Sequence, residues 1–114
     1  MEDSGKITKN DIKEEIDEVA ELSSSFFIGK TDEIPEDRLN AFPTYENIRI
    51  IAESGDKETI EWLEEEMIKA FKDYPEYDNE QAVNNVHLDD KNEVYRLYVV
   101  FILSEQYQHL KTLL

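Results

Sequence analysis

The chain has 114 residues, of which 39% are hydrophobic, so it can bury one modest core and is expected to form a single domain over residues 1–114. It has no cysteine, which excludes disulfides, thiolate metal sites and cysteine nucleophiles, and no apolar run approaches the roughly 20 residues of a membrane span. With 28 acidic and 12 basic residues the formal net charge is -16, a field that repels phosphate and anionic membrane surfaces at long range.

The excess of acidic over basic residues has two interpretations. The first is a surface that keeps the protein in solution. The second is a surface that mimics the negatively charged phosphate backbone of DNA, as in an inhibitor of a nucleic-acid-binding protein. The N-terminus, Met1 to Ser4, is acidic and no apolar segment follows it, so a signal peptide is not expected. We expect a soluble, cytoplasmic protein with no membrane partner and with a possible protein partner at its acidic surface.

The first third of the chain predicts a helix and then a strand. Apolar residues recur at helical spacing from Asn10 to Leu22, with Lys and Glu on the opposite side. The serines at 23–25 break this helix. The next segment, Phe26 to Gly29, has the aromatic and β-branched composition of a short strand that stops at a glycine turn.

A short helix and a second strand are expected next. Pro35 suits the first turn of a helix that carries Arg38 and ends near Phe42, because Pro43 disfavours helical geometry in the residue before it. The segment Asn47 to Glu53 reads as a strand that is largely buried, since its apolar residues do not simply alternate.

The rest of the chain predicts a long helix, a polar loop, a strand and a closing helix. Asp56 is placed to cap the helix Lys57 to Lys72, and residues 73–92 are mostly loop. Glu93 to Leu103 is strongly β-prone, and Ser104 to Leu114 can form a final helix. The predicted fold class is α/β or α+β, with a small three-stranded mixed sheet flanked by helices.

One carboxylate of the long helix lies on its apolar side. Glu64 follows Ile60 by four residues and precedes Met67 by three, so the three side chains share a face. A carboxylate on such a face is costly unless it is paired, hydrogen-bonded, protonated or bound to a metal. Glu64 is therefore either at the edge of the face, where it reaches water or a neighbouring lysine, or a site residue.

A strand that ends in Phe27-Ile28-Gly29, a helix with Arg38, a later helix with Glu64 and then Asn79 follow in an order that resembles the GIY-YIG nuclease superfamily. The resemblance covers residues 26–79. It implies that Phe27 and Gly29 belong to the second signature element, that Arg38 is the catalytic arginine, and that Glu64 binds Mg2+ or Mn2+. Asn79 would be the late asparagine of the family and would contact nucleic acid.

The chain departs from that family where tyrosine or histidine is usual. Phe27 replaces the tyrosine of the second signature element, and Phe42 replaces a histidine or tyrosine. No Gly-Ile-Tyr strand precedes Phe26, so Tyr95 in the last strand is the candidate substitute, through a rearranged strand order. The hydroxyl that activates water must then come from Tyr95, Tyr98 or Tyr45.

Phosphodiester hydrolysis with one divalent ion needs a carboxylate for the metal, a cation for the developing charge and a group that orients water. Glu64 and Arg38 supply the first two by the resemblance, and Lys30 and Arg49 are candidate nucleic-acid contacts beside them. Three functions remain open at this point. They are a divergent metal-dependent endonuclease acting on nucleic-acid phosphodiesters, a catalytically inactive GIY-YIG-like binding protein, and an acidic DNA-mimic inhibitor.

Overall fold

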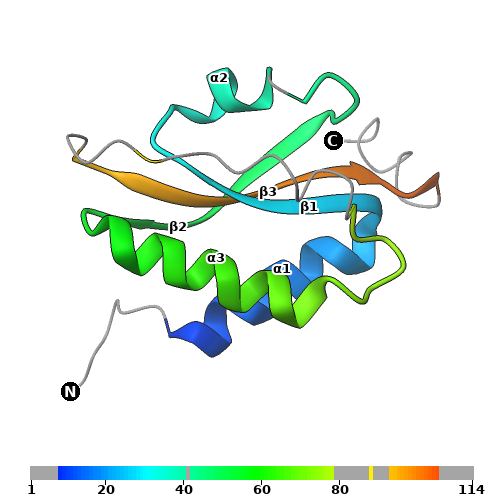
Figure 1. Cartoon of the computed structure of the whole chain (residues 1–114). Coiled ribbons are helices and arrows are strands. Elements are labelled where there is room, and N and C mark those ends of the chain that lie inside the picture. Colours follow the sequence, from blue (N-terminus) through cyan, green and yellow to red (C-terminus); the bar gives the residue numbers. More distant parts are fainter. Residues whose placement is uncertain (1–7, 41, 79–87, 89–92, 106–114) are drawn as a thin grey trace.

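The computed structural model describes residues 8–40, 42–78, 88 and 93–105. In chain order its elements are α1 (Lys9–Leu22), β1 (Ser23–Thr31), α2 (Pro35–Leu39), β2 (Asn47–Ser54), α3 (Lys57–Phe71) and β3 (Tyr95–Leu103). They form a small α+β domain with one three-stranded sheet. Helices α1 and α3 cover one face of this sheet, and the short helix α2 lies over the other face (Figure 1).

The strand order is β1-β3-β2, and β3 is antiparallel to both of its neighbours. The prediction of a mixed sheet was therefore wrong for the described strands. The strands β1 and β2 run in the same direction, but β3 lies between them, so they do not pair with each other. The centre suits β3 because its residues from Leu97 to Val100 are all buried, as a continuous apolar run allows.

The predicted first helix is confirmed, and it begins one residue earlier than expected. The Thr8 hydroxyl accepts a hydrogen bond from the Asp11 backbone N–H, and the Asp11 carboxylate accepts one from the Thr8 backbone N–H. This reciprocal pair satisfies two donors at the helix start. The helix buries its apolar stripe, which consists of Ile12, Ile16, Val19 and Ala20.

The strand β1 is longer than the sequence indicated. The serines that end α1 already belong to it, and it continues past Gly29 to Thr31. Its outer edge is closed by a later segment, because the Phe26 N–H donates to the Glu76 carbonyl at 3.0 Å and the Asp78 N–H donates to the Phe26 carbonyl at 2.8 Å. At Phe26, this edge of the sheet is therefore paired with the segment around Tyr77.

The strand β2 forms the opposite edge of the sheet. Its register with β3 shifts between Ile50 and Ala52, which places Ile51 in a bulge. Only Ile51 and Ala52 are buried in it, so the prediction of a largely buried strand holds for its middle alone. An edge strand has a neighbour on one side only, which explains the partial exposure.

The remaining predictions on the course of the chain have mixed outcomes. Pro35 begins α2 as expected, but the helix ends at Leu39 and does not reach Phe42. Asp56 caps α3, as predicted. Of the closing helix predicted at 104–114, residues 106–114 lie outside the described part of the chain. Among the described helices, none combines the length and the hydropathy needed to cross a membrane.

Two aromatic clusters fill the core, one on each side of β1. On the side of α3, Phe26 makes edge-on contacts with Phe71, Tyr74 and Tyr77, with ring centroids 5.3 to 6.2 Å apart. On the side of α2, Phe42 contacts Phe27 and Tyr98. Contacts of this kind add to the stability that area burial alone provides.

Candidate functional site

The Glu64 side chain lies against β1. Its Oε1 accepts a hydrogen bond from Lys30 Nζ at 2.6 Å, and the two side chains are only 15% and 12% exposed. Successive side chains of a strand point to opposite faces of the sheet, so Phe26, Ile28 and Lys30 share one face. This is the face that α1 and α3 cover, and Lys30 therefore reaches α3. The predicted metal ligand and the predicted phosphate contact therefore neutralise each other in a mostly buried ion pair.

Gly29 makes room for a tyrosine ring from the central strand. It is the register partner of Tyr98, and a Cβ placed on it would lie 2.4 Å from Tyr98 Oη and 2.5 Å from Tyr98 Cζ. Tyr98 is 1% exposed, so this ring is packed in the core. The glycine sits within β1, and the expectation that the strand ends there in a turn was wrong.

The two other aromatic residues named for the site are also packing residues. Phe27 is buried between the rings of Phe42 and Tyr77, at centroid distances of 5.7 and 6.1 Å. Tyr95 is the first residue of β3 and is 2% exposed. Neither side chain is presented to solvent, so neither is placed to contact a dissolved substrate in this structure.

The predicted basic residues are distributed over different faces of the sheet. Arg38 belongs to α2, which lies across the sheet from the α3 helix that carries Glu64 (Figure 1), and its side chain is outside the described part of the structure. Arg49 of β2 pairs with Glu15 of α1, with 3.2 Å between Nε and Oε2. Asn79 also falls outside the described residues. The structure brings Lys30 and Glu64 together and places Arg49 elsewhere.

A polar cluster that the sequence analysis missed joins three distant segments. The Tyr45 hydroxyl donates to Asp78 Oδ2 at 2.7 Å and lies 2.9 Å from Ser25 Oγ. Burial raises the pKa of Tyr45 to about 12, and Asp78 adds to this effect because its negative charge opposes ionisation of the hydroxyl. Burial likewise raises the pKa of Tyr77. No sequence signal connects residues that are 20 and 33 positions apart.

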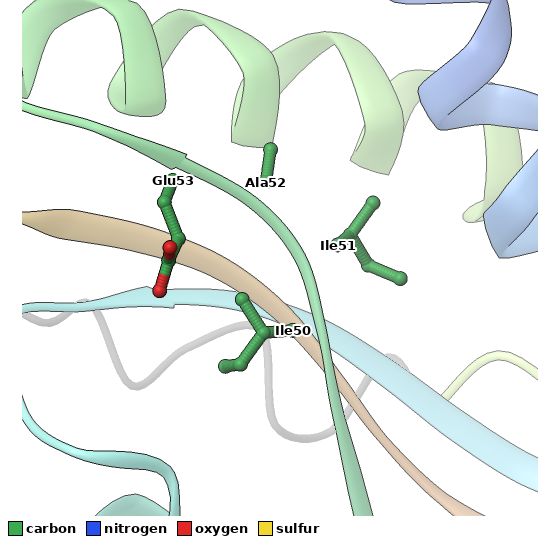
Figure 2. Close-up of a pocket in the computed structure, with 4 residues that line it drawn as sticks. All are labelled: Ile50, Ile51, Ala52 and Glu53. Atoms are coloured by element: carbon green, nitrogen blue, oxygen red, sulfur yellow. The ribbon is translucent and has the colours of Figure 1, made fainter. Parts of the chain in front are cut away.

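A hollow of about 430 Å³ lies along β2 and is lined by Ile50, Ile51, Ala52 and Glu53 (Figure 2). It contains none of the residues predicted for the site. Its one charged member, Glu53, accepts a hydrogen bond from Arg96 Nε at 2.8 Å. The hollow is open, and none of the four described residues that line it is a cation that could hold a phosphate.

Many of the cations in the described part of the chain are bound to carboxylates of the chain itself. Nitrogen–oxygen distances of 2.6 to 3.5 Å join five of them to acidic partners: Lys9 and Lys69 to Glu66, Lys30 to Glu64, Arg49 to Glu15, and Arg96 to Glu53. Acidic residues remain in excess on the exposed sides of α1 and α3. In the same residues, no three His, Cys, Asp or Glu side chains are grouped so that they could hold a metal ion.

The sequence analysis also did not single out the tryptophan of α3. Trp62 of α3 is 50% exposed, although tryptophan is usually well buried. The Lys9 ammonium lies over its ring at 5.5 Å from the centroid.

Comparison with protein-family models, with curated proteins and with solved structures gives no match to this chain.

Proposed function

We propose that this chain is a non-catalytic binding protein that recognises a cationic surface on another protein. The observation that carries the proposal is the mostly buried ion pair between Lys30 and Glu64. Because each residue neutralises the other, Glu64 is not free to bind a metal ion and Lys30 is not free to bind a phosphate. The same pair makes a structural contact between β1 and α3.

The charge of the chain indicates what the partner looks like. Its formal net charge is -16, and many described cations are already paired internally, so the outward field is negative. Such a field speeds association with a positively charged surface and disfavours association with nucleic acid. A basic protein surface, including one that otherwise binds nucleic acid, is the partner that fits best.

The experiment compares two oppositely charged probes by titration calorimetry at low ionic strength. We expect the protein to bind an octa-arginine peptide saturably and not to bind a DNA duplex. We also expect no cleavage of DNA or RNA in the presence of Mg2+ or Mn2+. Binding to the duplex together with no binding to the peptide would reject the proposal.

A divergent metal-dependent nuclease of the GIY-YIG kind is the second candidate, and one observation favours it. The last strand, β3, pairs antiparallel with the Phe27-Ile28-Gly29 strand and packs the ring of Tyr98 against Gly29. A rearranged strand order of this kind is what the resemblance needs to supply the missing first signature strand. This candidate requires hydrolysis that is lost in both Arg38→Ala and Glu64→Gln, and it requires Glu64 to exchange Lys30 for a divalent ion.

A further inference from the structure

The exposed side of α3 carries one large aromatic ring among carboxylates. Trp62 is half exposed, and Glu58, Glu65 and Glu66 stand four residues before it, three after it and four after it. Residues at these spacings are neighbours on a helix surface. We call these four residues the Trp62 face. Tryptophan is the residue type most enriched among the few that dominate binding energy at protein interfaces.

The Trp62 ring already accepts a cation from the chain itself. Lys9 Nζ lies 5.5 Å from the ring centroid and donates a hydrogen bond to Glu66 Oε1 at 2.7 Å. A ring face and a carboxylate thus hold one ammonium together, which is a favourable arrangement for a cation. The Lys9 side chain is 47% exposed, so this contact is at the surface and open to competition.

The other carboxylates of the Trp62 face are available for more positive charge. No described residue makes an ion pair with Glu58 or Glu65, and both side chains are exposed. A second copy of this chain is a poor occupant, because two molecules of charge -16 repel each other. An arginine is a better occupant than a lysine, since its planar guanidinium can stack on an aromatic ring while its N–H groups donate hydrogen bonds, within the guanidinium plane, to neighbouring carboxylates.

We propose that the Trp62 face is the docking surface for the cationic partner, with an arginine of that partner stacked on the Trp62 ring and further cations at Glu58 and Glu65. Lys9 occupies the ring in the free protein and is displaced on binding. This inference rests on the proposed function and adds the position of the interface and the chemistry of its central contact.

Trp62 is the sole tryptophan of the chain, so tryptophan emission, excited selectively over tyrosine, reports on this face alone. The experiment titrates the protein with octa-arginine at low ionic strength and records tryptophan emission together with heat of binding. We expect the emission to change and to saturate at the same peptide concentration as the heat. A binding isotherm with unchanged emission would place the peptide elsewhere and overturn the inference, while the proposed function would stand.

Two pairs of variants sharpen the test. Trp62→Ala should weaken octa-arginine binding by roughly five- to thirtyfold, because it removes the stacking surface. Its control is Ile34→Ala, since Ile34 is 51% exposed and precedes α2 on the other side of the sheet, and this change should leave the affinity unaltered. Equal affinities of Trp62→Ala and wild type would overturn the inference.

The second pair removes one positive charge from α1 at two positions. Lys9→Ala should tighten binding more than Lys13→Ala, because Lys9 contacts the Trp62 ring and Glu66. Equal effects of the two substitutions would show that net charge alone is responsible and would count against displacement of Lys9. Absence of octa-arginine binding by the wild-type protein would reject the inference and the proposed function together. Circular dichroism of each variant verifies that the fold is retained.

Discussion

Lys30 Nζ and Glu64 Oε1 lie 2.6 Å apart, although the two residues are separated by 34 positions in the chain. The pair joins the C-terminal end of β1 to the middle of α3, and little of either side chain reaches solvent. A carboxylate that the sequence marks as unusual is thereby explained as a structural contact.

Removing one partner of this ion pair should destabilise the protein. Glu64→Gln and Lys30→Met each leave the other charge mostly buried and uncompensated, and we expect the free energy of unfolding to fall by about 1–3 kcal/mol. The double variant Lys30→Met/Glu64→Gln should recover part of that loss, because no charge is then left buried. Urea unfolding of the four proteins forms a double-mutant cycle that measures the coupling.

The exposed pair of Lys9 and Glu66 provides the matched control. Its side chains are 47% and 24% exposed, so Glu66→Gln should destabilise the protein much less than Glu64→Gln does, as is usual for surface ion pairs. If Glu64→Gln is no more destabilising than Glu66→Gln, the Lys30–Glu64 contact is not a mostly buried ion pair in solution.

Even the smallest side chain at Gly29 should destabilise the protein, because the Tyr98 ring occupies the space beside it. Gly29→Ala would put a Cβ within 2.5 Å of the buried Tyr98 ring, and we expect a loss of about 1–3 kcal/mol, the usual cost of overpacking a core. Gly55→Ala is the control, because the nearest atom to its Cβ is the Glu93 carbonyl oxygen at 3.3 Å and the site is exposed. Thermal unfolding of both variants makes the comparison. Similar melting temperatures would show that the ring does not occupy the space above Gly29.

Stability should fall in alkaline solution because of Tyr45. Its pKa rises from 10.0 in the unfolded chain to about 12 in the folded protein, so its contribution is fully present below pH 10 and is lost as the pH approaches 12. Urea unfolding of wild type and Tyr45→Phe across this range should show a shallower decline in the variant. The decline that remains belongs in part to Tyr74 and Tyr77, whose pKa values are also raised. Parallel curves would show that the Tyr45 hydroxyl is not buried beside Asp78 in solution.

Local signals in the sequence predicted most of the secondary structure. The cap at Asp56, the proline at position 35 and the apolar periodicity of α1 each depend on residues within one or two turns, and the corresponding helix starts are confirmed or lie within one residue. The boundary of β1 was missed, since serines that break a helix can equally begin a strand. Strand direction was missed as well, because a short apolar run does not encode which neighbour it will pair with.

The candidate site was less predictable than the fold. The position of Glu64 on the apolar face of α3 was correctly read as anomalous, and the alternative in which it meets a neighbouring lysine is confirmed. Which lysine it meets depends on the packing of β1 against α3, and no pattern in either segment specifies that. The Ser25, Tyr45 and Asp78 cluster has the same origin, because three segments must fold together before its members meet.

The salt dependence of octa-arginine binding tests the central claim most directly. If the acidic surface recognises a cationic partner, the dissociation constant should rise by roughly tenfold or more between about 50 and about 300 mM salt, because screening weakens contacts between exposed charges. Calorimetric titration at several salt concentrations measures this slope. Affinity that does not change with salt, or no binding even at low salt, would contradict the account.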